Sequence, residues 1–161
     1  MLDRLFGEIK KDIFAPVNGK IIPIEDVKDS IFAKKVMGDG AAFKSDEDVI
    51  YAPCNGRITK IAKTGHALWL KTDGNVEILL HVGVRTAFLN GEGFHVLVRE
   101  GRNVMPHAPL IKLDKSFLEE KKTDLTTVLI ITDQRKFELK KTSADVVDIN
   151  TKVLQLCRNK K

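Results

Sequence analysis

Apolar residues along this chain come in short runs separated by turn-forming residues. The runs occupy residues 49–52, 57–61, 76–82, 127–132 and 146–156, with Gly, Pro, Asn or Asp between them. Such spacing is typical of antiparallel β-strands joined by tight turns. Helical signals are few. A capping pattern at Ser116 opens about two turns that end near Lys122, and residues 29–37 favour another short helix. The pattern predicts an all-β protein with a few short helices.

One phrase occurs twice in the chain. Ile13-Phe-Ala-Pro-Val-Asn-Gly-Lys-Ile21 returns as Ile50-Tyr-Ala-Pro-Cys-Asn-Gly-Arg-Ile58, and each copy places a Pro-x-Asn-Gly turn between two apolar stretches. We therefore expect two related hairpin-rich units that pack on each other.

Two histidines flank a further hairpin signal. Residues 66–71 and 76–81 are predicted strands around Asp73-Gly74, a dipeptide that favours a tight turn. A two-residue or four-residue loop would set His66 opposite His81, with Cβ atoms roughly 5 Å apart. This register puts Leu68 and Leu79 on the face that carries the imidazoles. A loop of odd length would break the register.

Composition narrows the class of protein. A chain of 161 residues fits one domain, and no apolar run is long enough to span a membrane. Residues 151–161 hold four cations and no acid, which leaves only +1 of the net charge of +5 for the rest and argues against nucleic-acid binding. No signal peptide precedes the first strand, so we expect a cytoplasmic protein in which Cys54 and Cys157 stay reduced. Residues 1–12 predict an amphipathic or flexible segment that could touch a membrane surface weakly.

A histidine pair suits three chemistries, and the rest of the sequence separates them. Zinc would require further ligands, but no His-x-His, His-Glu-x-x-His or cysteine pair lies nearby. This also disfavours a zinc peptidase on a related duplicated β scaffold. Acyl transfer would require a nucleophile and a carboxylate placed by motif.

Phosphoryl transfer needs only a neutral imidazole and an N–H donor at a shallow site. Nothing resembles a Gly-rich phosphate loop, so the phosphoryl donor should be another phosphoprotein. A swinging-arm carrier domain is disfavoured because no lysine lies in an evident modification motif.

The residues around His81 resemble a known family. Gly74-Asn-Val-Glu-Ile-Leu-Leu-His81-Val-Gly83-Val-Arg-Thr86, together with Thr64-Gly-His66-Ala and Leu89-Asn-Gly-Glu-Gly-Phe94, is similar to the glucose-type IIA component of the bacterial phosphotransferase system. The resemblance covers roughly residues 13–156, which we take as one domain, with residues 157–161 as a basic tail.

The resemblance implies a compact antiparallel β-sandwich that uses no cofactor or metal. It implies that His81 accepts a phosphoryl group on Nε2 from HPr and passes it to the IIB unit of a IIB/IIC sugar permease. It further implies that His66 donates a hydrogen bond to the phosphate, and that Thr64 and the Gly83 carbonyl orient the rings. We expect the partner-binding surface to comprise Asp29, Ile31, Phe32, Val36, Met37, Leu68, Lys71, Leu79 and Arg85.

Three cations depart from the family pattern. Arg85 stands where relatives usually carry an acid that faces arginines on their partners, and Lys34 and Lys71 stand where acids are common on the docking rim. Because like charges across an interface slow encounter, the sequence predicts slow transfer from a typical HPr. Either the partners carry compensating acids, or the chain is a regulatory binding protein of the same fold with weak or no transfer.

Overall fold

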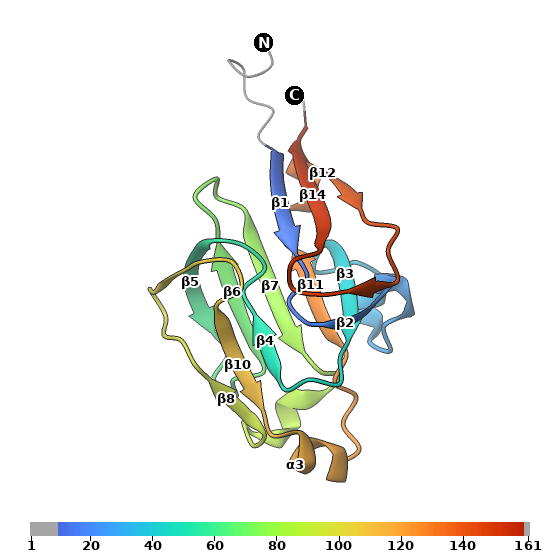
Figure 1. The fold of residues 1–161 in the computed structure, drawn as a ribbon, viewed down its shortest axis with the longest axis vertical. Helices are drawn as coiled ribbons and strands as arrows, with labels where there is room; N and C mark the ends of the chain where they lie inside the picture. The colour runs from blue at the N-terminus through green and yellow to red at the C-terminus, as the bar shows by residue number, and fades with distance from the viewer. Residues whose placement is uncertain (1–9, 160–161) are drawn as a thin grey trace.

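The computed structural model describes residues 10–159, and their strands form three antiparallel sheets (Figure 1). The long sheet has the order β13-β2-β3-β11-β7-β6-β5-β9, and the two small sheets have the orders β1-β14-β12 and β4-β10-β8. The long sheet comprises β2 (Gly19–Ile22), β3 (Asp39–Lys44), β5 (Gly56–Ile61), β6 (Ala67–Lys71), β7 (Glu77–Val82), β9 (Asn103–Val104), β11 (Thr127–Ile131) and β13 (Val146–Val147). The small sheets comprise β1 (Lys10–Phe14), β12 (Phe137–Lys141) and β14 (Lys152–Arg158), and β4 (Val49–Tyr51), β8 (Phe94–Val96) and β10 (Pro109–Leu113).

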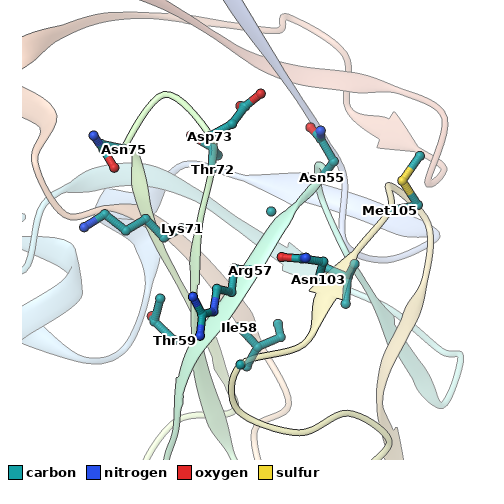
Figure 2. Close-up of a pocket in the computed structure, with 13 residues that line it drawn as sticks. Asn55, Arg57, Ile58, Thr59, Lys71, Thr72, Asp73, Asn75, Asn103 and Met105 are labelled. Atoms are coloured by element: carbon teal, nitrogen blue, oxygen red, sulfur yellow. The ribbon is translucent and has the colours of Figure 1, made fainter.

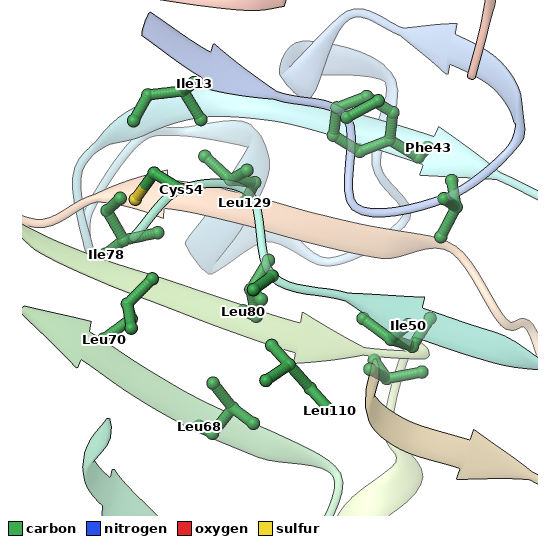
Figure 3. Close-up of a cluster of buried hydrophobic side chains, with 14 of the residues drawn as sticks. Ile13, Phe43, Ile50, Cys54, Leu68, Leu70, Ile78, Leu80, Leu110 and Leu129 are labelled. Atoms are coloured by element: carbon green, nitrogen blue, oxygen red, sulfur yellow. The ribbon is translucent and has the colours of Figure 1, made fainter. Parts of the chain in front are cut away.

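The main core lies between the long sheet and the sheet β4-β10-β8. Leu68 of β6 and Leu80 of β7 lie beside Leu110 of the facing sheet (Figure 3), and these three residues and Ile50 are all buried. Two antiparallel layers with apolar inner faces form a β-sandwich. The predicted fold class is confirmed.

The repeated phrase marks the place where two units of the fold meet. The Phe14 N–H donates to the Pro53 carbonyl and the Tyr51 N–H donates to the Pro16 carbonyl, both over 2.8 Å. Each copy of the phrase therefore supplies one donor and one acceptor to the other. This reciprocal pair of hydrogen bonds is the contact expected between two related units.

Short helices connect the strands. They are η1 (Ile24–Asp26), α2 (Ser30–Ala33), η2 (Thr86–Leu89), α3 (Lys115–Glu120) and η3 (Gln134–Lys136). The helix expected within residues 29–37 is α2, and the Asp29 carboxylate caps it by accepting a hydrogen bond from the Ile31 N–H. The prediction that Ser116 caps the other helix is wrong, since Asp114 takes that position and accepts from the Phe117 N–H.

The first and last strands extend beyond residues 13–156. Residues 10–12 lie in β1 and residues 157–158 lie in β14, and these strands pair with Lys10 opposite Cys157. The predicted amphipathic segment falls mainly on residues 1–9, outside the described residues, and its contact with a membrane surface stays a prediction. No helix within residues 10–159 has the length and hydrophobicity needed to cross a bilayer.

The predicted register of the histidine hairpin is wrong by one residue. Lys71 pairs with Glu77 and Ala67 pairs with His81, because the turn from Thr72 to Val76 contains an odd number of residues. The Thr72 N–H donates to the Val76 carbonyl, and the Val76 N–H donates to the Thr72 hydroxyl. A shift of one residue exchanges the two faces of a strand.

The corrected register moves Leu68 away from the histidines. Its side chain is 0% exposed and lies in the main core with Leu80 (Figure 3). The prediction that Leu68 belongs to the partner-binding surface is therefore wrong. The outer face of β6 carries Ala67, Trp69 and Lys71 instead.

Replacing Leu68 with alanine should destabilise the fold rather than the surface. Loss of a fully buried leucine should lower the free energy of unfolding by about 3 kcal/mol. Leu97→Ala is the control, because Leu97 is 42% exposed and should cost less than about 1 kcal/mol. Urea denaturation measures both values. Equal losses in the two variants would contradict the burial of Leu68.

Candidate functional site at the histidine pair

The two imidazoles meet although they do not occupy paired positions. His81 lies in β7 opposite Ala67, and His66 immediately precedes β6, where its carbonyl accepts a hydrogen bond of 2.7 Å from the Val82 N–H. The ring centroids of His66 and His81 are 4.9 Å apart, with an interplanar angle of 81°. One ring thus presents its edge to the other, and a single small group could contact both.

A tight turn holds the His66 ring. The Thr64 hydroxyl lies 2.5 Å from His66 Nδ1, and Gly65 between them has a φ of 72°, a conformation that glycine adopts at low cost. If the hydroxyl donates to Nδ1, the proton of the neutral ring is on Nε2. His66 can then donate a hydrogen bond from that atom.

His81 is packed on its other side by Phe32 of α2. The two ring centroids are 4.9 Å apart, and Phe32 is buried in a second, smaller core on the outer face of the long sheet with Leu79 and Ile130. His81 Nδ1 is buried and forms no hydrogen bond within residues 10–159. The structure therefore leaves Nε2 as the ring nitrogen that an incoming group can reach.

The backbone after His81 is fixed by close packing. Gly83 has a φ of 84°, and a Cβ atom there would lie 2.2 Å from Cγ2 of Thr86. The Gly83 N–H donates to the Thr126 carbonyl over 2.9 Å.

The Asp124 carboxylate accepts hydrogen bonds from the backbone and hydroxyl of Thr126. These hydrogen bonds outweigh the effect of burial and hold the pKa of Asp124 below its usual range.

Both histidines are neutral near pH 7. Burial lowers the pKa of His81 to about 4, and the charge of nearby His66 adds to the lowering. The Gly83 backbone and the Asp29 carboxylate act in the opposite direction but are outweighed. Burial also lowers the pKa of His66. A neutral imidazole keeps the lone pair that a nucleophile or a hydrogen-bond acceptor needs.

The predicted partner-binding residues fall into three groups. Ile31, Val36 and Met37 are 51%, 69% and 39% exposed, and they lie in or directly after α2, next to the Phe32 ring that covers His81. Phe32 and Leu79 are buried beneath this surface. Asp29 caps α2, and Arg85 is exposed in a left-handed conformation at the start of η2.

Lys71 lies away from the histidines, at the turn end of β6. It lines a hollow of about 550 Å³ together with Arg57 and Asn103 (Figure 2). Trp69 is not among the predicted site residues. It lies on the outer face two residues from Ala67, and Lys60 Nζ is 4.9 Å from its ring centroid. Phe94, whose ring centroid is 6.4 Å from that of His66, is not among the predicted site residues either. Correct alternation along β6 would have identified Trp69.

Fold and site together define a β-sandwich protein with a pair of neutral histidines near its surface. Residues 11–137 match the model of the family described as phosphoenolpyruvate-dependent sugar phosphotransferase system, EIIA 1. The glucose-specific EIIA component of Buchnera aphidicola is 39% identical over 152 residues, covering 94% of both chains. The glucoside-specific EIICBA component of Staphylococcus carnosus is 38% identical over 121 residues, which cover 75% of this chain and 18% of that protein. The structure of glucose permease IIA from Mycoplasma capricolum matches with a TM-score of 0.85 and 28% identity, over 93% of this chain and 97% of that one.

The chain therefore belongs to the EIIA 1 family of the phosphoenolpyruvate-dependent sugar phosphotransferase system. It is a phosphotransferase component that acts as a phosphocarrier in sugar uptake.

Acidification should weaken the fold through His81. The folded protein resists protonation of this ring down to about pH 4, whereas the ordinary value is 6.5. Between these values the unfolded chain binds more protons, so about 3 kcal/mol of unfolding free energy should be lost as the pH falls. Urea unfolding of the wild type and of His81→Gln from pH 7 to pH 4 checks this, because the variant should lose less. An NMR titration midpoint of His81 at or above pH 6 would contradict the prediction.

Proposed function

We propose that His81 is the residue that carries the phosphoryl group and that Nε2 forms the bond to phosphorus. The observation that supports this is the neutral imidazole with its Nδ1 atom buried. The Nε2 lone pair would attack the phosphorus of a phosphohistidine on the donor. The donor's N–P bond breaks as the new one forms, and its electron pair returns to the donor imidazole. The proton on His81 Nδ1 stays in place.

His66 is proposed to steady the group in transit. Its edge faces the His81 ring at a centroid distance of 4.9 Å, and the Thr64 hydroxyl at Nδ1 favours a proton on Nε2. An N–H donor held at this place can bind a phosphoryl oxygen as charge develops on it. Thr64 orients the His66 ring, and the Gly83 backbone, which lies close enough to raise the pKa of His81, helps to orient that ring; neither residue reacts itself.

We infer that HPr is the donor and that the IIB unit of a IIB/IIC sugar permease is the acceptor. The family assignment supports both partners, and the name of the Staphylococcus carnosus relative joins C, B and A components in one protein. Ile31, Val36 and Met37 are exposed apolar residues beside the Phe32 ring and would form the centre of the contact, with Asp29 and Arg85 at its rim. Two free, buried cysteines fit the reducing cytoplasm.

Phosphorylation can be tested with purified components. The protein is incubated with phosphoenolpyruvate, enzyme I and HPr, and intact mass is measured before and after mild acid. We expect one acid-labile phosphoryl group in the wild type and none in His81→Ala. His66→Ala should still be phosphorylated but should pass the group to IIB at least about a hundredfold more slowly.

His95→Ala is the matched control, because His95 is an exposed histidine in β8. It should behave as the wild type in both steps. Phosphate that persists in His81→Ala, or that is lost in His66→Ala, would overturn the assignment of roles. Circular dichroism confirms that each variant keeps its sheets.

A further inference from the structure

We propose that the surface around the histidine pair binds partners that present acidic residues. This inference rests on the proposed function, because it concerns the phosphoprotein that must reach His81. It is supported by where the strand register places cations, by the lack of ion pairs for those cations, and by the internal hydrogen bonds of the nearby acids.

Strand register places cations on the face that carries His81. Lys60 of β5 pairs with Trp69 of β6, which pairs with Leu79 of β7, two residues before His81. The next row toward the turn sets Arg57 opposite Lys71. Ile58, between the two β5 cations, is fully buried in the main core, so Arg57 points to the outer face. A cationic strip of Arg57, Lys60 and Lys71 therefore runs along β5 and the turn end of β6, on the face that carries His81.

Further cations lie near the histidine pair and the exposed apolar residues Ile31, Val36 and Met37. Lys34 caps the C-terminus of α2, two residues after Phe32, and Lys63 precedes Thr64 in the turn that holds His66. Arg85 begins η2, four residues after His81. Six exposed cations thus lie along the outer face of β5 and β6 or in the segments next to the histidine pair: Lys34, Arg57, Lys60, Lys63, Lys71 and Arg85. Within residues 10–159 none of them takes part in an ion pair with a carboxylate.

Four acids near this surface have partners inside the protein. Asp29 accepts the capping hydrogen bond from Ile31, and Glu77 accepts a hydrogen bond of 3.0 Å from the Thr132 hydroxyl. Asp124 binds Thr126. Asp73 lies 3.4 Å from Lys11 Nζ. Glu25 and Asp26 of η1, next to α2, are exposed as well, so the excess of unpaired cations lies along β5 and β6.

A hollow extends the cationic strip beyond the row of Arg57 and Lys71 (Figure 2). Its volume is about 550 Å³, and Asn55, Asn75 and Asn103 line it with side-chain amides. Amide, ammonium and guanidinium groups all donate hydrogen bonds to carboxylates. An acidic loop of a partner that docks over His81 could insert at this end of the face.

Charge reversal on the cationic strip tests the proposal. The triple variant Arg57→Glu, Lys60→Glu, Lys71→Glu should accept phosphate from the HPr of the same genome about tenfold more slowly at 50 mM salt, because complementary charge mainly raises the association rate. At 500 mM salt the difference should shrink to about twofold, since screening shortens the range of the field. Arg85→Asp alone should slow transfer about threefold at low salt.

The control variant carries the same charge change on the two small sheets. Lys112→Glu, Lys140→Glu, Lys152→Glu replaces exposed lysines of β10, β12 and β14 and should change the rate by less than about twofold. A second arm uses an HPr whose surface acids are replaced by lysines. This donor should transfer slowly to the wild type and faster to the triple variant.

Several outcomes would overturn the proposal. Faster transfer from the unaltered HPr to the triple variant would mean that the partner presents cations. Equal rates at all salt concentrations would mean that the strip does not touch the partner. Loss of binding to anionic phospholipid vesicles with unchanged transfer would assign the strip to a membrane surface instead. These failures are distinct from failure of the proposed function, in which wild-type His81 would carry no phosphate even after long incubation with either donor.

Discussion

The pairing register of β6 with β7 is the constraint on which the site depends. With Ala67 opposite His81, Leu68, Leu70 and Leu80 fill the main core, and His81 joins Leu79 and Trp69 on the outer face. A slip of β6 by one residue would expose Leu68, whereas a slip of β7 by one residue would drive the His81 imidazole into the core. Thr72, which is 3% exposed, holds the register because its backbone and hydroxyl both bond to Val76. A turn far from the chemistry therefore decides which face is functional.

Burial prepares His81 for two tasks at once. Packing against Phe32 removes the charged form of the ring, so that a lone pair is present at neutral pH, and it leaves only Nε2 accessible. The same burial would be unfavourable for a charged group with no partner. His66 and the surface cations lie where they could compensate the negative charge of a phosphoryl group.

The sequence predicted the all-β class, the two units and the meeting of the histidines, since these depend on apolar spacing and on a short loop. The predicted length of that loop was wrong. Asp73-Gly74 indicates a turn. Whether the number of residues in that turn is even or odd depends on the hydrogen bonds of Thr72 to Val76, which accompany the burial of Thr72. The error placed Leu68 on the wrong face and hid Trp69. Asp114 and Ser116 can both cap a helix, and the hydrogen bond from the Asp114 N–H to the Gly93 carbonyl favours the former.

The pairing of β1 with β14 brings the two ends of the described chain side by side, with Lys10 opposite Cys157. In Figure 1 these ends lie at the top, whereas β7 carries His81 toward the opposite end of the molecule. A covalent connection at either end would therefore leave the histidine surface free. The same unit can exchange between separate partners by diffusion, or it can be tethered beside one acceptor, where the linker sets a high effective concentration for each transfer.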